Sequence, residues 1–303
     1  MLYEFAPAKL NLYLHVTGRQ ANGFHNLDSL AVFAGVGDGI RIESAQLLSL
    51  IIEGPQAANL ARESIESNLV YKAALALAKK LNLSPDITIT LTKNLPVASG
   101  IGGGSSDAAA TLRALARQWG LRPDDARLAE IAARLGQDVL VCLNAKTCMM
   151  TTEGTTPINP DYIPHTDIVL VNPNKALPTP AVFRDFREQN DAFSPHAPPV
   201  RKMSHATALA QSMSAQRNDL TAPAIRLMPE IGDMLKTIAE TKNCLLSRMS
   251  GSGATCFGLY PDRSSAKQAA SQLLQAHPGW WVVPTYLPAR EDAMSPGIST
   301  ETI

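Results

Sequence analysis

Apolar and polar positions alternate near the N-terminus, which predicts an amphipathic strand in this region. From position 10 to position 16 every second residue is apolar, namely Leu10, Leu12, Leu14 and Val16. The intervening positions carry Lys9, Asn11, Tyr13 and His15. Because successive side chains of a strand point to opposite faces, these four polar groups are expected to share one face.

Further strands are predicted where short apolar runs are bounded by turn residues. They span 30–33, 40–43, 48–53 and 87–91, and the second and third are expected to form a hairpin. Helical spacing appears at residues 68–81, where Leu69, Ala73, Leu77 and Leu81 recur along one side. Two more helices are predicted at 105–119 and 124–135, and Gly136 ends the second.

The second half of the chain also mixes strands and helices. Residues 151–165 have the turn-rich composition expected of a crossing between two domains. A strand at 167–171 leads through two prolines into a helix, and residues 189–203 are predicted to be a variable loop. The remaining elements are two strands around a Gly-Ser-Gly loop within 247–260, a helix at 264–275 and a strand at 280–286.

A glycine-rich loop is the strongest local signal in the chain. Gly100 and the three glycines at 102–104 follow the predicted strand 87–91 and precede an Ala-rich helical run. Glycines let the backbone approach a polyanion, and the free N–H groups and dipole of a helix start favour negative charge. The layout therefore predicts a phosphate-binding loop, in which Ser105 or Ser106 caps the following helix.

The spacing of the glycines excludes the two commonest nucleotide-binding loops. No Lys follows the last glycine, so the P-loop pattern G-x-x-x-x-G-K-[ST] is absent, and G-x-G-x-x-G cannot be placed over residues 100–107. A flexible Gly/Ser linker is the remaining alternative. Such linkers are rarely wedged between two strongly patterned elements, which favours the binding loop.

Length, charge and cysteine content narrow the classes of function. A chain of 303 residues is expected to form two domains. Lys plus Arg and Asp plus Glu both number 27, and this zero net charge argues against nucleic acid or an anionic membrane as the main partner. The four cysteines form no C-x-x-C pair, which predicts a reduced, cytoplasmic protein. Without a signal-peptide pattern or a window of about 18 apolar residues, a soluble chain is expected.

Several residues are candidates for chemistry. Lys9 and Asn11 would lie side by side on the polar face of the first strand, although the residues alone favour simple solvent exposure, since lysine is usually a solvated surface residue. Phe24 and His25 lie in a polar loop and suit a planar base, because one can stack while the other hydrogen-bonds. Asp138 lies between a helix end and an apolar run, where it is either a reactive carboxylate or a helix cap.

These motifs resemble those of the GHMP superfamily of small-molecule kinases, which groups galactokinase, homoserine kinase, mevalonate kinase and phosphomevalonate kinase. The loop matches P-x-x-x-G-[LI]-G-G-G-S-S-[DN]-A-A. An A-P-A-K-x-N-L-x-L pattern precedes it, and an S-G-[ST]-G-[AP] pattern follows at 250–254, in the same order as in the superfamily. The triple glycine followed by Ser-Ser is most similar to the kinases of 4-diphosphocytidyl-2-C-methyl-D-erythritol.

The resemblance implies an α+β fold of two domains with the active site in the cleft between them. Residues 1–155 would form a ribosomal-S5-like N-terminal domain that holds ATP, and residues 156–290 a ferredoxin-like C-terminal domain. Residues 291–303 would be a flexible tail. The superfamily also has a left-handed β-α-β crossover in its first domain, against the general handedness rule.

The resemblance also implies roles for individual residues. Lys9 and Asp138 would be catalytic, with Lys9 near the reacting hydroxyl and Asp138 as its base or orienter. The substrate would contact Asn11, Phe24, His25, Thr179 and Phe183, with its cytosine between the two phenylalanines. ATP would contact Asn68, Lys93, Pro96, Val97, Ala98, Ser99, Gly100, Ile101, Gly102, Gly103, Gly104, Ser105 and Ser106.

Three of these assignments have an equally good structural explanation from the residues alone. Asn68 fits the N-cap of the helix that follows it. Lys93 fits a strand end that is exposed to solvent, and Phe183 fits a core anchor of its helix. Their roles at the ligand therefore come from the resemblance.

The implied reaction transfers the γ-phosphoryl group of ATP to the 2-hydroxyl of the cytidyl alcohol, in the non-mevalonate route to isoprenoid precursors. Mg²⁺ would be held mainly by the phosphates, with Ser106 as a candidate ligand. ATP and a small-molecule alcohol are the expected partners, without nucleic acid or membrane, and the chain would be a monomer or a weak homodimer.

Two alternatives stay open. The first is a superfamily kinase of the homoserine or mevalonate type. The second is a nucleotide-binding regulator without catalysis, because Gln137 and Leu140 replace the family's Ala and Pro beside Asp138.

Overall fold

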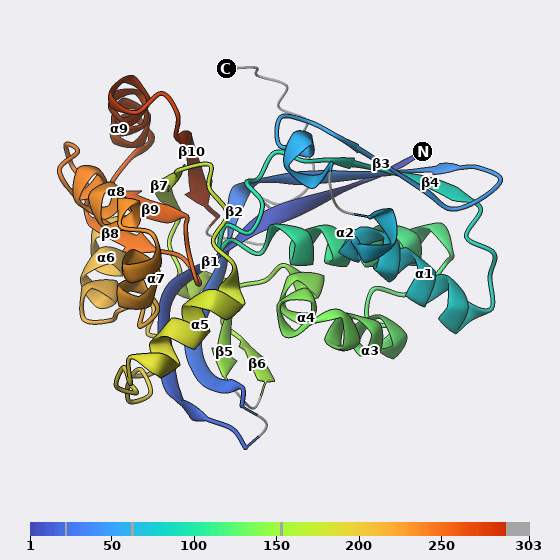
Figure 1. Ribbon diagram of the computed structural model, residues 1–303, viewed down its shortest axis with the longest axis horizontal. Helices are drawn as coiled ribbons and strands as arrows, with labels where there is room; N and C mark the ends of the chain where they lie inside the picture. Colours follow the sequence, from blue (N-terminus) through green and yellow to red (C-terminus); the bar gives the residue numbers. More distant parts are fainter. Residues whose placement is uncertain (22, 62–63, 152–153, 289–303) are drawn as a thin grey trace.

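Two β-sheets with helices packed against them form the molecule, which confirms the predicted α+β class (Figure 1). The computed structural model describes residues 1–21, 23–61, 64–151 and 154–288. The predicted tail at 291–303 lies outside the described residues. In the described part, no helix combines the length and the apolar character that a membrane span requires.

A long antiparallel ribbon of β1 (Leu2–Arg19) and β2 (His25–Ser44) runs through the molecule. Its register shifts between Pro7 and Lys9 and between Asn11 and Tyr13. One edge of β2 pairs with β1, and the other edge pairs with β4 (Ile87–Thr92) and with β5 (Cys148–Thr151). The predicted strands at 30–33 and 40–43 are therefore parts of one strand.

The predicted hairpin between residues 40–43 and 48–53 is wrong. Strand β4 lies between the two segments, because β3 (Ser49–Glu53) pairs in parallel with the far edge of β4. A parallel pair needs a crossover, and helix α1 (Leu69–Leu81) provides it. Strand β6 (Gly154–Pro157) follows β5 and ends this first sheet.

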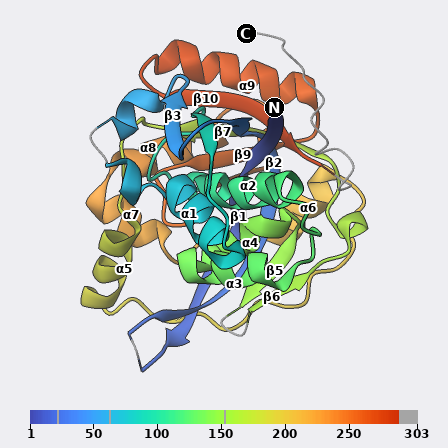
Figure 2. The ribbon, with the colours of Figure 1, turned by 90° about the vertical axis from the view of Figure 1, so that its right-hand side faces the viewer.

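Four helices cover one side of the first sheet (Figures 1 and 2). They are α1, α2 (Gly103–Gln118), α3 (Ala126–Leu135) and α4 (Gln137–Asn144). Their small and branched residues form one core with the sheet, including Ala73, Leu77, Leu112 and Ile131. Helix α4 directly follows α3, and Gly136 is its N-cap, so Asp138 lies in the first turn and does not cap the helix.

The second sheet has the order β10-β7-β9-β8. Its strands are β7 (Thr166–Asn172), β8 (Leu246–Met249), β9 (Cys256–Tyr260) and β10 (Trp281–Leu287). The helices of this half are α5 (Thr179–Glu188), α6 (Ala206–Ser214), α7 (Thr221–Leu227), α8 (Glu230–Ala239) and α9 (Arg263–Ala276). Residues 189–205, all described, contain neither helix nor strand, in agreement with the predicted loop.

A shared core joins the two halves. Leu10 of β1 and Leu30 of β2 pack in one buried cluster with Leu170 of β7 and Phe257 of β9. The ribbon of β1 and β2 is thus hydrogen-bonded within the first sheet, and its side chains pack against the second sheet. A domain boundary near residue 155 stays a prediction.

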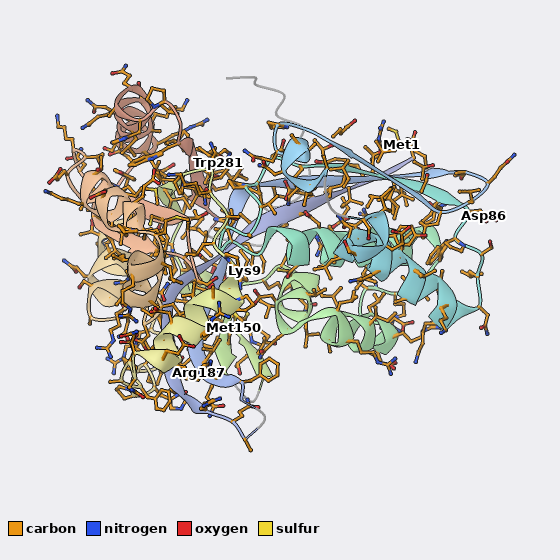
Figure 3. All side chains as sticks on the ribbon, viewed as in Figure 1. Met1, Lys9, Asp86, Met150, Arg187 and Trp281 are labelled. Atoms are coloured by element: carbon orange, nitrogen blue, oxygen red, sulfur yellow. The ribbon has the colours of Figure 1, made fainter. Side chains whose placement is uncertain are left out.

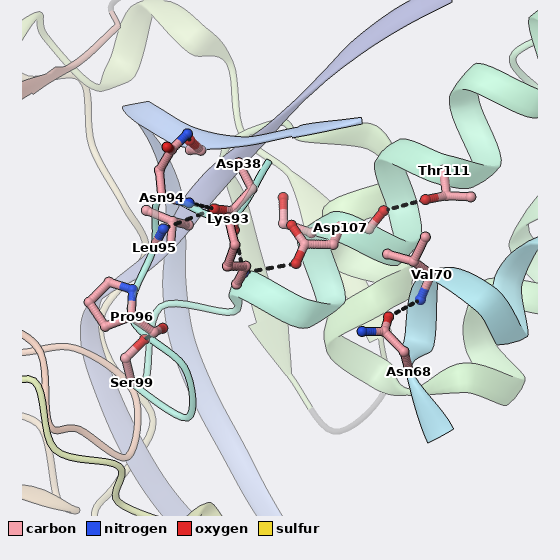
Figure 4. A network of polar contacts seen from close by, with 12 residues as sticks. Asp38, Asn68, Val70, Lys93, Asn94, Leu95, Pro96, Ser99, Asp107 and Thr111 are labelled. Carbon is pink, nitrogen blue, oxygen red and sulfur yellow. Dashed lines mark hydrogen bonds and ion pairs between the residues drawn. The ribbon is translucent and has the colours of Figure 1, made fainter. Parts of the chain in front are cut away.

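A buried ion cluster holds β2, β4 and α2 together (Figure 4). The ammonium group of Lys93, directly after β4, pairs with Asp107 of α2 at 2.8 Å and with Asp38 of β2. Asp38 also accepts a hydrogen bond from the backbone N–H of Leu95 at 2.9 Å. The alternative that Lys93 ends its strand in solvent is therefore wrong.

In this cluster, burial and ion pairing shift the pKa of Lys93 in opposite directions. Burial alone would lower the pKa of Lys93, but the Asp107 and Asp38 carboxylates raise it above its ordinary value. Burial raises the pKa of Asp107 to about 8, against the effect of Lys93. Lys93 is therefore the cation that makes the burial of these two acidic side chains possible.

We expect Lys93→Met to lower the free energy of unfolding by about 3 to 5 kcal/mol, because it leaves two buried carboxyl groups without their cation. Urea denaturation measures this loss. Lys80→Met is the matched control, since Lys80 pairs with Glu130 on the surface at 2.7 Å, and it should cost no more than about 1 kcal/mol. An equal, small loss in both variants would contradict the role of the cluster.

Candidate active site

A cavity of about 380 Å³ opens between the two halves of the molecule. It is lined by β1, the glycine loop, the starts of α1, α4 and α5, and the Gly-Ser-Gly loop between β8 and β9. Lys9 of β1 lies near the middle of the molecule in Figure 3. Elements that are far apart in the sequence therefore converge on one site.

The glycine loop is fixed by its carbonyl oxygens. Four consecutive carbonyls, of residues 98–101, each accept a hydrogen bond, and the donors come from three segments that are distant in the sequence. The donors are the N–H of Leu177 to Ala98, the N–H of Thr255 to Ser99, the hydroxyl of Ser250 to Gly100 and the N–H of Lys9 to Ile101, at 3.0–3.1 Å. The backbone N–H groups of residues 100–105 have no acceptor among the described residues. They form a cradle of free donors, as an anion site requires.

Two glycine motifs touch through their backbones. Gly100 has φ +75°, and a Cβ added to it would lie 2.5 Å from the carbonyl oxygen of Ser250. A Cβ added to Gly251 would lie 2.6 Å from the carbonyl oxygen of Gly100. Side chains at these two positions would separate the loops, so the close approach requires glycine.

The start of α2 differs from the prediction. Gly102 is its N-cap, with φ +64° and no side-chain cap, so neither Ser105 nor Ser106 caps the helix. The hydroxyl of Ser106 is buried and donates to the carbonyl oxygen of Pro7 at 2.7 Å. Pro96–Gly100 and residues 102–105 line the cavity, whereas the buried Ile101 and Ser106 do not.

Lys9 and Asp138 form an ion pair at the cavity, with 2.8 Å between Nζ and Oδ1. Lys9 is only 3% exposed, so the alternative of a solvated lysine is wrong. Asp138 lies in the first turn of α4, where the helix dipole favours a carboxylate. Burial would lower the pKa of Lys9, but the Asp138 carboxylate raises it above its ordinary value. The lysine therefore remains a cation at neutral pH.

Asn11 faces the same cavity as Lys9, as strand alternation predicts. Its Nδ2 donates to the hydroxyl of Ser29 at 2.7 Å, and its backbone N–H donates to the hydroxyl of Ser250 at 3.1 Å. Ser250 therefore joins the strand that carries Lys9 to the glycine loop. Sequence reasoning did not single out Ser29, whose position in an apolar strand was the available signal.

The aromatic residues are arranged differently from the prediction. His25 stacks on Phe183 of α5, with ring centroids 5.0 Å apart, and contacts Phe186 edge-on at 5.8 Å. Phe183 lines the main cavity, whereas Phe24 is 72% exposed and lines a separate cavity of about 170 Å³ with His25 and Gln137. An open slot between Phe24 and Phe183 is therefore not observed, because the imidazole occupies the face of Phe183.

The environment of His25 keeps its imidazole neutral. Burial lowers the pKa of His25 below 6.5, and the positive charges of Arg19 and Arg187 lower it further. At neutral pH one ring nitrogen can donate a hydrogen bond while the other accepts one. Such a group suits the edge of a nucleobase, which presents donors and acceptors side by side.

Asn68 and Thr179 also line the cavity. Asn68 accepts a hydrogen bond from the N–H of Val70 at 2.9 Å, so it is the N-cap of α1, and it also lines the cavity. Thr179 begins α5, and its hydroxyl lies 2.7 Å from that of Ser252 in the Gly-Ser-Gly loop. Sequence reasoning missed Ser252 and Asp38, although both lie beside glycines in apolar surroundings.

Comparisons with known proteins show which family the chain is similar to. The family models "GHMP kinases N terminal domain" and "GHMP kinases C terminal" match residues 68–146 and 200–279. The 4-diphosphocytidyl-2-C-methyl-D-erythritol kinase of Paramagnetospirillum magneticum is 46% identical over 93% of this chain and 97% of its own. That of Ruegeria pomeroyi is 50% identical over 91% of this chain and 96% of its own.

Solved structures show the same fold. A crystal structure of 4-(cytidine 5'-diphospho)-2C-methyl-D-erythritol kinase matches with a TM-score of 0.76 and 29% identity, over 95% of this chain and 100% of that one. Homoserine kinase from Cytophaga hutchinsonii matches with a TM-score of 0.69 and 18% identity, over 94% of each chain, which shows the fold alone. The chain belongs to the GHMP kinases, in the family of its 4-diphosphocytidyl-2-C-methyl-D-erythritol kinase relatives.

Proposed function

We propose that this protein transfers the γ-phosphoryl group of ATP to the 2-hydroxyl of 4-diphosphocytidyl-2-C-methyl-D-erythritol, in non-mevalonate synthesis of isoprenoid precursors. The observation that carries this proposal is the ion pair of Lys9 and Asp138 beside the cradle of free N–H groups. Relatives named for this substrate share 46–50% of their residues with the chain. Kinases of the homoserine and mevalonate types share 12–18%.

The glycine loop would hold the phosphates of ATP. Its free N–H groups and the start of α2 supply positive partial charge without a mobile side chain. Within the loop, the carbonyl oxygen of Ile101 accepts the backbone N–H of Lys9. The γ-phosphoryl group would therefore lie next to Lys9 and Asp138.

Asp138 would orient the reacting hydroxyl and accept its proton. Its side chain is 44% exposed and reaches into the cavity, as a base that must meet a substrate requires. Lys9 would stabilise the negative charge that spreads over the transferred phosphoryl group. Phosphoryl transfer requires little covalent chemistry from the protein, so positioning and charge account for most of the catalysis.

Mg²⁺ would be held mainly by the ATP phosphates. Among the described residues no cluster of three or more metal-ligating side chains exists, and Mg²⁺ commonly uses phosphate oxygens, waters and one or two carboxylates. Ser105 lines the cavity, whereas the predicted ligand Ser106 does not. Bound Mg²⁺ would neutralise charge on the phosphates.

The cytosine would bind at His25 and Phe183. Stacking on one aromatic face contributes about 1 to 3 kcal/mol. His25 would hydrogen-bond to the edge of the base, and Phe24 is the proposed partner for its second face. For the base to reach Phe183, the His25 ring must turn away from the stacked position seen here.

The remaining proposals concern the cellular location and the oligomeric state. All four cysteines are free, which supports a reduced, cytoplasmic setting where ATP is abundant. We propose a monomer or a weak homodimer.

An acceptor panel tests the proposed function. ADP release is followed with Mg·ATP and either 4-diphosphocytidyl-2-C-methyl-D-erythritol, homoserine or mevalonate. We expect turnover with the cytidyl alcohol alone. ATP binding without turnover of any alcohol would favour the regulator instead, and preferred turnover of homoserine or mevalonate would favour another kinase type.

The variant Asp138→Asn should lower kcat by about 10²- to 10⁴-fold, because the carboxamide keeps the shape of the side chain but cannot accept the proton. Asp124→Asn is the control, since Asp124 pairs with Arg122 on the surface at 2.7 Å. Steady-state kinetics give the kcat of both variants, and Asp124→Asn should match the wild type. A fall of less than about threefold for Asp138→Asn would remove Asp138 from the catalytic role.

The KM for the cytidyl alcohol should depend on the charge of His25. Because burial and the neighbouring arginines lower the pKa of His25 from its ordinary value, KM should be lowest near pH 8, where the imidazole is neutral, and should rise as the pH falls through the lowered pKa. Protonation then replaces an acceptor nitrogen with a second donor. In His25→Gln, which does not titrate, the same rise would show that another group causes it. The KM for ATP serves as an internal control.

A further inference from the structure

Arg113 of α2 binds two neighbouring elements with one guanidinium group. Its side chain is 22% exposed and donates four hydrogen bonds, to α4 and to β1. These are the elements that carry Asp138 and Lys9. We propose that Arg113 is a positioning residue, which fixes Asp138 relative to Lys9 by holding the end of α4 against β1.

The contacts with α4 are made at its C-terminus. Nη1 donates to the carbonyl oxygen of Cys142 at 2.8 Å and to that of Leu143 at 3.2 Å. The last carbonyls of a helix have no partner within the helix and carry partial negative charge. The carbonyl oxygen of Cys142 also accepts the N–H of Ala145, and the added bonds from the cation fix the position of the helix end.

The contacts with β1 lie near the start of the strand. Nη2 donates to the carbonyl oxygen of Phe5 at 2.8 Å, and Nε donates to Oε1 of Glu4 at 2.7 Å. Phe5 precedes Lys9 by four residues in β1. Arg113 therefore defines the distance between the end of α4 and the strand that carries the catalytic lysine.

Because helix α4 is short, the position of its C-terminal end determines the position of Asp138 in its first turn. It spans Gln137–Asn144, so Cys142 lies about one turn beyond Asp138. A shift of the C-terminal end moves the whole helix, because its eight residues form a rigid unit of about two turns. A misplacement of about 1 Å can lower a rate by about 100-fold.

The geometry requires arginine rather than any cation. The planar guanidinium presents donors in several fixed directions, whereas a lysine ammonium is one compact point on a flexible chain. Lysine at position 113 can neutralise the helix end but cannot bridge α4 and β1 with the same geometry. The positioning role therefore predicts partial rescue by Arg113→Lys.

Arg117 offers a matched control one turn further along α2. It donates to the carbonyl oxygen of Tyr3 at 2.9 Å and pairs with Glu4, so it shares the contact with β1. The described contacts of Arg117 include none with α4. A comparison of Arg113→Met with Arg117→Met therefore separates the contact with α4 from the shared ion pair with Glu4.

The test rests on the proposed function and measures ADP release with Mg·ATP and the cytidyl alcohol. We expect Arg113→Met to lower kcat by about 10- to 100-fold, with the KM for ATP unchanged, because α4 moves while the loop does not. Arg113→Lys should recover part of the rate, and Arg117→Met should equal the wild type. Rates are divided by the number of ATP-binding sites, so partial unfolding does not mimic the effect.

Hydrogen exchange in α4 gives a second readout that does not need turnover. The amides of residues 141–145 should exchange faster in Arg113→Met and stay at the wild-type rate in Arg117→Met. Equal kcat, or equal exchange, in the two methionine variants would overturn the positioning role. An inactive wild type would count against the proposed function alone, since the exchange comparison still tests the positioning of α4.

Discussion

The backbone contact between two glycine motifs is the constraint on which the site depends. Gly100 and Gly251 meet so closely that neither position has room for a Cβ. The contact turns the carbonyl oxygens of residues 98–101 toward the rest of the protein and leaves the N–H groups of the loop free. A polyanion site is thereby built from the main chain, and both halves of the molecule contribute to it.

Few positively charged side chains line this cavity. Among the described residues that line it, the positively charged side chains are Lys9 and Lys93, and each is already paired with a carboxylate. Oriented N–H groups therefore supply most of the attraction for phosphate, at no cost in side-chain ordering. Lys9 is exceptional because its partner, Asp138, is itself exposed to the cavity and can exchange the ammonium for a substrate.

Local patterns predicted the local structure well. The alternation from Leu10 to Val16 and the glycine loop were recognised, and so was α1, because each signal lies within one segment. The prediction failed where a distant segment decides the outcome: β4 separates residues 40–43 from 48–53, and the burial of Lys93 depends on Asp38 and Asp107. The stack of His25 on Phe183 likewise depends on α5, which is remote in the sequence.

The stereochemistry of transfer tests the central claim most directly. The claim is that one cavity holds ATP and the alcohol together, with Asp138 accepting a proton and not the phosphoryl group. ATP made chiral at its γ-phosphorus with oxygen isotopes reports the number of displacements. A single in-line transfer inverts the configuration in the phosphorylated alcohol, and this account predicts inversion. Retention would mean two successive displacements through a phosphorylated residue and would contradict it.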